Sequence, residues 1–524
     1  MRFVSIAFSF LLAFMPSLVI AQNQAYNGQT ANEIFLPQLL HDNSNASIFY
    51  DALVATGLKD TLNQYWDSNY PTIDYERSIQ AIRDHYAGVH RIETIYESFY
   101  LAMPDKREFK YTIFVVSDSD LVNNGIHNLD ELRQFARSVY PEGASLPDKD
   151  RASSLNRLLS YHILPFWLPY DQINVSQPQI VRNRKYLDEL DIEDFYETLL
   201  PHSVMRISTP YNENGIPLGV FINRKGTIKT RLEAEGIEIS KDCNSCINGG
   251  YYYISSLLLY DSFTRNNTLN TRMRIMASTL SPDFINSGAR GRLRGDPANN
   301  GDEYLNRLAY SFKPEFCKNI NWIEDQTHLY VKSRDVAYGI YYGDEVLIQG
   351  SFDIAFRLPS VPSDGLYEIR IPNVALISSL WQNGGTTLFY LQKEGGDLIP
   401  LRTPVNLNIS LKDSLIGAVS DGDEKYYGLS DSQKEAAINA DDLLLHKKGY
   451  LKSPDSYGPY SSASMREDPN IYRLIISELY MEADKYYYLR LRQVSNEDAL
   501  FPLNYIELVP YSVYSGENGP EDKH

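Results

Sequence analysis

The feature that most constrains the fold is a pair of apolar runs on either side of an amphipathic segment. The first run, Lys110–Val116, is typical of a buried strand, and Ser117 or Asp118 can cap a helix directly after it. The second run, Tyr251–Leu259, follows an Asn-Gly-Gly turn at residues 248–250. Between them, apolar residues and a histidine recur at the spacing of one helical face: Leu155, Leu158, Leu159 and His162. We expect Asp148 to cap this helix, and the order of elements predicts an α/β core.

The N-terminus has the pattern of an export signal. Arg2 supplies a positive charge, and Phe3–Met15 is almost wholly apolar. Pro16 ends this run, and Val19-Ile20-Ala21 has the spacing of a signal-peptidase site. The run is shorter than the roughly 18 residues that a transmembrane helix needs. We therefore expect a signal peptide over 1–21, a flexible N-terminus over 22–31, and a mature chain without a transmembrane segment. Its location would be the periplasm, the outer cell surface or the extracellular space.

Size and charge narrow the class of protein. A chain of 524 residues predicts two to four domains at about 100–200 residues per domain. The formal net charge is −18, from 49 basic and 67 acidic residues. An acidic surface repels phosphate backbones, so we expect no nucleic-acid partner.

Three cysteines are too few for a disulfide framework. Cys243 and Cys246 could form a redox pair, a metal hairpin or a local disulfide. A zinc site takes four ligands, and Cys317 is far along the chain. A redox pair would open a helix after a strand, whereas this pair precedes a turn. In an oxidising compartment we therefore expect a local disulfide between Cys243 and Cys246, with Cys317 buried.

From about Thr264 the chain alternates apolar and polar residues in short runs between Pro and Gly turns. Examples are Ser351–Leu358, Tyr367–Ile371 and Asn504–Pro510. Short strands at this spacing predict a β-sandwich or jelly roll. A helical insertion near 430–449 interrupts it, with a capping-box spacing at Ser432 and Glu435 and a stop at Gly449.

The sequence shows no combination of residues that is typical of a catalytic site. The nine histidines show no metal-ligand spacing, and there is no nucleophile elbow, phosphate-binding loop or dinucleotide fingerprint. His162 lies on an apolar stripe, where we expect a buried, hydrogen-bonded structural residue. These features predict a non-catalytic protein with no cofactor and no metal.

Trp322 and Trp381 are the candidate binding residues. Aromatic faces stack on sugar rings in many carbohydrate sites, although packing is the commoner role of a large aromatic side chain in a β-sandwich. Carbohydrate binding through loop aromatics is therefore one hypothesis for the second half of the chain.

Three motifs of the first half resemble the fasciclin domain, a secreted α/β adhesion module. They are Thr112-x-Phe114-x-x-Ser117-Asp118, His162-Ile163, and Asn248-Gly249 through Leu258. The segment Ala46–Leu58 is similar to the opening helices of that family. The resemblance covers about residues 31–263 and implies a fasciclin-like α/β domain over 32–263 with a role in adhesion.

The second half resembles the tail domain of fasciclin-type proteins from Bacteroidetes. The matching segments are Arg272-Met-Arg274, Gly449–Tyr457 and Leu503–Pro510. The resemblance implies an all-β, galactose-binding-like sandwich over 264–524, and so an α+β chain overall. It also implies an exported cell-envelope protein for adhesion or glycan capture, accessory to polysaccharide uptake, with a glycan or an envelope protein as partner. The alternative is an envelope scaffold that makes protein–protein contacts without binding carbohydrate.

Overall fold

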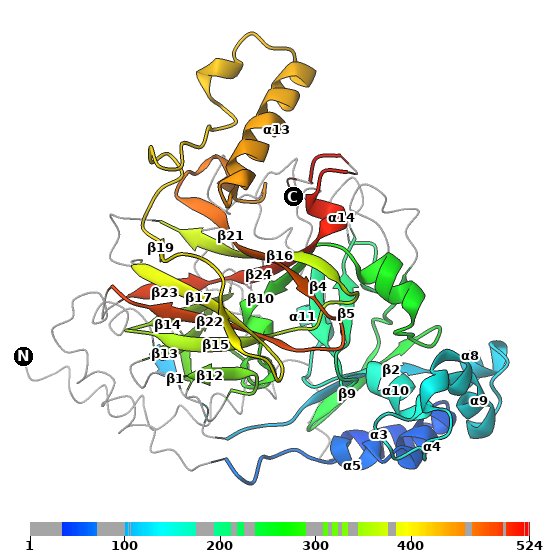
Figure 1. Cartoon of the computed structure of the whole chain (residues 1–524). Coiled ribbons are helices and arrows are strands. Elements are labelled where there is room, and N and C mark those ends of the chain that lie inside the picture. The colour runs from blue at the N-terminus through cyan, green and yellow to red at the C-terminus, as the bar shows by residue number, and fades with distance from the viewer. Residues whose placement is uncertain are drawn as a thin grey trace, which may run out of the picture.

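The computed structural model shows a strand-rich, mixed α/β chain (Figure 1). It describes residues 34–70, 100–102, 104, 106–173, 193–210, 217–224, 236–289, 308–312, 317–322, 327–333, 344–375, 384–455, 464–495, 499–517, 519–521 and 523. Five sheets form within these residues. The expected signal peptide and flexible N-terminus lie outside them.

The first half centres on a four-stranded sheet in the order β3-β2-β9-β8. Strand β2 (Tyr111–Val116) is buried along its whole length, as its apolar sequence predicts. It runs parallel to β9 (Gly249–Ile254) and antiparallel to β3 (Ile163–Leu164), and β8 (Cys243–Cys246) forms the far edge. Six helices gather beside this sheet at the lower right of Figure 1: α3 (Leu36–His41), α4 (Ser47–Ala55), α5 (Leu58–Leu62), α8 (Asp118–Asn123), α9 (Leu129–Val139) and α10 (Ser154–Tyr161).

The Asn-Gly turn before β9 is a packing device. Gly249 has φ +138°, and a Cβ there would lie 2.0 Å from the backbone oxygen of Tyr111, so only glycine allows β9 to approach β2 this closely. The fully buried Asn248 side chain accepts from Leu36 N–H at 2.9 Å and donates to the Leu62 carbonyl at 2.6 Å. The turn thereby joins the sheet to α3 and α5.

The helix caps follow backbone geometry. Ser117 accepts the N–H of Asp120 and caps α8, which confirms one of the two predicted caps. The predicted cap of α10, Asp148, is wrong. Ser153 has the extended backbone of a cap residue and accepts the N–H of Asn156, while the Asp148 carboxylate accepts from Arg133 Nε at 2.7 Å.

A second small sheet has the order β4-β5-β6-β7. Strand β5 (Val204–Ser208) pairs with β4 (Glu193–Glu197) and β6 (Phe221–Ile222); β7 is Ile237–Glu238. The short helix α11 (Tyr170–Ile173) precedes this sheet in the chain. Strand β4 packs on β10 of the second half.

The second half contains two antiparallel sheets, as expected for a β-sandwich. One has the order β10-β24-β16-β21-β20: Met273–Met276, Tyr505–Pro510, Gly365–Val374, Ile471–Met481 and Tyr450–Lys452. The other has the order β12-β15-β22-β17-β18, with β19 beside β17: Ile320–Trp322, Asp353–Leu358, Tyr487–Gln493, Thr386–Lys393, Leu398–Pro400 and Val405–Asn406.

A fifth sheet combines both halves in the order β1-β11-β13-β14-β23. Strand β1 (Tyr100–Ala102) belongs to the first half and runs parallel to β11 (Leu308–Phe312). The remaining strands are β13 (His328–Ser333), β14 (Asp344–Gln349) and β23 (Leu500–Leu503). One cluster of buried hydrophobic residues, including Phe114 and Leu508, extends through both halves of the chain.

The predicted helical insertion is α13 (Asp431–Lys447), which projects from the body at the top of Figure 1. Its capping box uses Ser430 and Gln433, so the predicted pair Ser432 and Glu435 is wrong, because the extended backbone that a cap needs occurs at Ser430. Gly449 follows the end of the helix with φ +85°, which confirms the predicted stop. None of the described helices is long and apolar enough to cross a bilayer.

Candidate functional site

Of the two candidate tryptophans, the structure describes only the backbone of Trp322. Trp322 is the last residue of β12, where its backbone pairs with Ile354 of β15. Trp381 lies outside the described residues. Carbohydrate stacking on either ring therefore stays a prediction.

The predicted disulfide between Cys243 and Cys246 is wrong, since both residues are thiols in the structure. They occupy the first and last positions of one strand, β8. Three steps of about 3.3 Å put their Cα atoms about 10 Å apart, beyond the roughly 4.4–6.8 Å of a disulfide. Burial raises the pKa of the Cys246 thiol to about 12. Cys317 is buried, as predicted.

His162 is the buried structural residue that its position on the apolar stripe predicts. Its Nδ1–H donates to the Leu158 carbonyl at 3.0 Å, and its Nε2 accepts the N–H of Leu258 at 3.0 Å. Burial lowers the pKa of the ring to about 4, so the residue is neutral at pH 7. With both nitrogens occupied, the ring joins α10 to the segment after β9 and is not available as a base.

A different set of residues forms the most distinctive site, on the sheet that contains β16. Alternation along the strands divides apolar from charged side chains, because successive residues point to opposite faces. Ile369, Ile371, Ile506 and Leu508 point to one face, while Glu368, Arg370 and Glu507 point to the other. Cross-strand register then places Arg274, Glu507 and Arg370 in one row across β10, β24 and β16.

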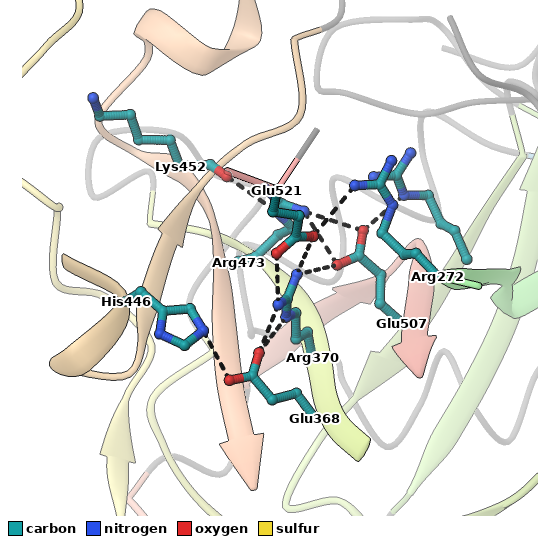
Figure 2. Close-up of polar contacts among 9 residues, drawn as sticks. Arg272, Glu368, Arg370, His446, Lys452, Arg473, Glu507 and Glu521 are labelled. Atoms are coloured by element: carbon teal, nitrogen blue, oxygen red, sulfur yellow. Dashed lines mark hydrogen bonds and ion pairs between the residues drawn. The ribbon is translucent and has the colours of Figure 1, made fainter. Parts of the chain in front are cut away.

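Glu507 is the centre of this arginine–glutamate cluster, which comprises Arg272, Arg274, Glu368, Arg370, Arg473, Glu507 and Glu521 (Figure 2). Its carboxylate accepts from Arg274 Nε at 2.8 Å and from Arg473 Nη1 at 3.2 and 3.3 Å. Arg370 Nη1 lies 3.7 Å from the same carboxylate. Glu507 is fully buried, so the arginines supply the stabilisation that water would otherwise give its charge.

Arg370 binds two further carboxylates from opposite directions. Its Nε and Nη2 donate to Glu368 Oε2 at 2.8 and 2.6 Å. Its Nη1 and Nη2 donate to the two oxygens of Glu521 at 2.7 and 2.9 Å, the geometry of a bidentate pair. Arg272 Nη1 adds a contact of 3.3 Å to Glu521.

The helical insertion closes one side of the cluster. His446, in the last turn of α13, places Nε2 2.8 Å from Glu368 Oε1. The carbonyl of Lys452, on β20, accepts from Arg473 Nε at 3.0 Å. Figure 2 shows His446 and Glu521 approaching Glu368 and Arg370 from outside the sheet.

Neighbouring arginines hold the carboxylates of Glu507 and Glu521 in the charged form. Burial raises the pKa of Glu507, but Arg473, Arg274 and Arg370 outweigh it and bring the pKa well below its usual range. In the same way Arg370 and Arg272 outweigh burial and lower the pKa of Glu521 to about 2. Burial disfavours charge on Arg370, yet Glu521, Glu368 and Glu507 together raise its pKa above the ordinary value.

This arrangement suits anion recognition better than proton transfer. A general acid or base needs a pKa near the working pH, whereas Arg370, Glu507 and Glu521 stay charged across the neutral range. Arginine forks bind carboxylates with defined geometry. Among the described residues, no group of three or more His, Cys, Asp and Glu could hold a metal ion.

The sequence contains weak signals of this cluster. Glu368-Ile-Arg370, Arg272-Met-Arg274 and Glu507 each interrupt an apolar strand with charge. Each taken alone is typical of a solvent-facing position, and only the strand register shows that they share one buried face.

Comparisons with known proteins give no family. No family model matches the chain, and no curated protein matches it. A toxin structure, the mosquito-larvicidal Cry4Aa from Bacillus thuringiensis, aligns with 39% of this chain and 24% of its own at 12% identity and a TM-score of 0.18. The alignment therefore spans about a quarter of that chain.

Two other solved structures give similar values. A family 35 carbohydrate binding module from Clostridium thermocellum aligns with 36% of this chain and 98% of its own, at 11% identity and a TM-score of 0.16. A family GH115 4-O-methyl-α-glucuronidase, BtGH115A, aligns with 44% and 23%, at 12% identity and a TM-score of 0.15. At these TM-scores the likenesses carry no conclusion about fold or function.

Proposed function

We propose that the chain is an exported, non-catalytic cell-envelope protein that acts in adhesion or glycan capture, accessory to polysaccharide uptake. The observation that carries this proposal is the arginine–glutamate cluster on an outer face of the sandwich. Its arginine side chains are held in fixed orientations and bind carboxylates through paired hydrogen bonds, which is the geometry with which binding proteins hold anions.

A fasciclin-like first half is part of the proposal. Its support is that the three motifs resembling that family meet in space. Strand β2 lies parallel to β9, and α10 ends at His162, which accepts a hydrogen bond from Leu258 after β9. The galactose-binding-like second half is supported by the two antiparallel sheets of the sandwich.

Glycan capture is tested with the purified mature chain on a glycan array and in affinity gels containing neutral or acidic polysaccharides. The whole chain is used because the hydrophobic core is shared between its halves. We expect saturable retention by at least one polysaccharide and no turnover of it. A folded protein that shows no retention across such panels would contradict glycan capture.

A second candidate function, a scaffold for protein–protein contacts, is favoured by exposed apolar side chains on and near the projecting insertion. Leu443 and Leu444 of α13 are 54% and 58% exposed, and Leu415 and Tyr427 are 79% and 73% exposed. Contiguous exposed apolar patches mark contact surfaces, and Leu443 and Leu444 are adjacent on the helix. Replacing both helix leucines with serine should abolish recovery of a defined envelope partner without changing glycan retention; unchanged recovery would count against the scaffold.

A further inference from the structure

Glu521 differs in origin from the other carboxylates of the cluster. Glu368 and Glu507 belong to strands, and the sheet register fixes their places. Glu521 instead follows α14 (Tyr511–Tyr514), a helix with no buried residue, and two positive-φ glycines, Gly516 and Gly519. Helix α14 packs on β16 and β24, and Glu521 lies beyond it, outside the strands of the sheet.

Beyond α14, the described contacts that hold this segment are polar and lie at Glu521 and Lys523. Glu521 is held by Arg370 and Arg272, and the carbonyl of Lys523 accepts the N–H of Asp455 at 2.6 Å. Residues 516, 517, 519 and 520 are exposed. The bidentate ion pair between Arg370 and Glu521 is thus the main polar contact described for this segment.

Withdrawal of Glu521 would leave a buried arginine with a site shaped for a carboxylate. Arg370 is 0% exposed and would keep only Glu368 and the longer contact to Glu507. The guanidinium atoms that now bind both oxygens of Glu521 would face the vacated position. A buried charge that loses its partner is costly, so another carboxylate is favoured there.

Aromatic rings lie beside this position. His446, which contacts Glu368, stacks with Tyr514 at 6.3 Å between centroids, and Tyr511 lies against Tyr514 at 5.5 Å. Tyr511 is itself 43% exposed. A row of aromatic rings that runs from Glu368 to the exposed Tyr511 suits a ring that bears a carboxylate, because the face of a sugar ring packs on an aromatic plane.

We infer that Arg370 and Arg272 form a binding site for the carboxylate of an acidic sugar, and that Glu521 occupies this site as a displaceable internal competitor. The inference rests on the proposed function and names the ligand class of the same cluster. The sugar cannot bind while Glu521 occupies the site. The apparent affinity for the sugar is therefore the intrinsic affinity multiplied by the fraction of molecules in which the site is open.

The test is binding of tri-galacturonate to the full mature chain at pH 7 by calorimetry. We expect Glu521→Gln to bind at least about tenfold more tightly than the parent, because the competing charge is removed while the side-chain size is kept. Glu435→Gln, an exposed position on α13, is the matched control and should equal the parent. Adding Arg272→Gln to Glu521→Gln should abolish the gain, with circular dichroism confirming that each variant is folded.

Three results would overturn the inference: no gain in the folded Glu521→Gln variant, an equal gain for the carboxyl-reduced trisaccharide, or binding of an acidic peptide in place of the sugar. The acidic peptide could be the Glu521 segment of a second copy of the chain, which would make the protein a dimer. Glu521→Gln would then reduce dimer formation, which light scattering measures. Retention of neutral glycans by the parent with no gain in the variant would reject the inference alone. No retention of any glycan by either protein would reject the proposed function as well.

Discussion

Arg357 of β15 lies 2.5 Å from the Glu197 carboxylate of β4, with its guanidinium 4.1 Å from the centre of the Tyr486 ring. The contact joins the two halves of the chain. Burial raises the pKa of Glu197, and Arg357 opposes that shift only in part. The carboxylate therefore depends on this arginine for its charge.

This dependence predicts unequal effects of removing the two partners. Arg357→Met should lower the free energy of unfolding by about 1–3 kcal/mol, because it leaves a partly buried carboxylate without its ion-pair partner. Glu197→Gln should cost less, since the arginine keeps its contact with Tyr486. Urea unfolding measures both, with Arg137→Met at an exposed position of α9 as control. Equal costs for the two variants would contradict this view of the pair.

His162 predicts a loss of stability at mildly acidic pH. Its pKa is about 4 when folded, against 6.5 for an ordinary histidine, so folding favours the neutral ring. The contribution is fully present above pH 6.5 and is lost as the pH falls towards 4, about 3 kcal/mol in total. His162→Gln should remove this component from the pH dependence of unfolding. His41→Gln, at an exposed site, should leave it in place, and an unchanged profile in His162→Gln would be inconsistent with a buried neutral ring.

Glu521 predicts a second, more acidic transition. Its folded pKa of about 2 lies below the ordinary value of 4.5, so its contribution is present above pH 4.5 and is lost as the pH falls through 2. The difference corresponds to about 3 kcal/mol at neutral pH. The gap in unfolding free energy between parent and Glu521→Gln should therefore narrow between pH 4.5 and 2. A gap that stayed constant over this range would show that Glu521 is not held as an ion.

Glu507→Gln should be the most damaging single substitution in the cluster. It leaves Arg274, Arg370 and Arg473 around a neutral group in a fully buried position, and removal of one partner from a buried charge group costs about 3–5 kcal/mol. Thermal and urea unfolding would measure the loss, with the exposed Glu424→Gln as control. A cost no greater than that of the control would mean that the arginines do not depend on Glu507.

The state of the cysteines predicts that the stability of the protein does not depend on reductant. Because Cys243 and Cys246 are thiols, unfolding curves with and without dithiothreitol should coincide. All three cysteines should react with iodoacetamide after denaturation without reduction, as counted by mass spectrometry. Cys246 should react far more slowly in the folded protein at pH 8, since its pKa is about 12. An unreduced chain with a mass two units below that of the three-thiol form would show that the disulfide is present.

Local pattern was enough to predict elements whose signal lies within a few residues. The burial of β2, the environment of His162 and the stop at Gly449 are confirmed. The predicted caps at Asp148 and Ser432 were wrong, since the caps are Ser153 and Ser430, because a cap depends on which residue adopts an extended backbone and not on composition alone.

The cluster could not be predicted because its members meet only through long-range pairing. Arg274 and Glu507 are 233 positions apart, and Arg370 and Glu521 are 151 apart. Alternation marks these residues as the polar side of their strands. Burial of that side comes from α13 and the segment after α14, whose positions no local pattern indicates.

The parallel pairing of β1 with β11 affects the order in which the chain can fold during synthesis. Residues 100–102 leave the ribosome about two hundred positions before the strand that they flank. Their partner among the described strands, Leu308–Phe312, emerges only later, and a strand without its partner is open to mispairing with a neighbouring chain. The first half is thus completed by the second, and a nascent chain that stalls between them would be expected to need a chaperone.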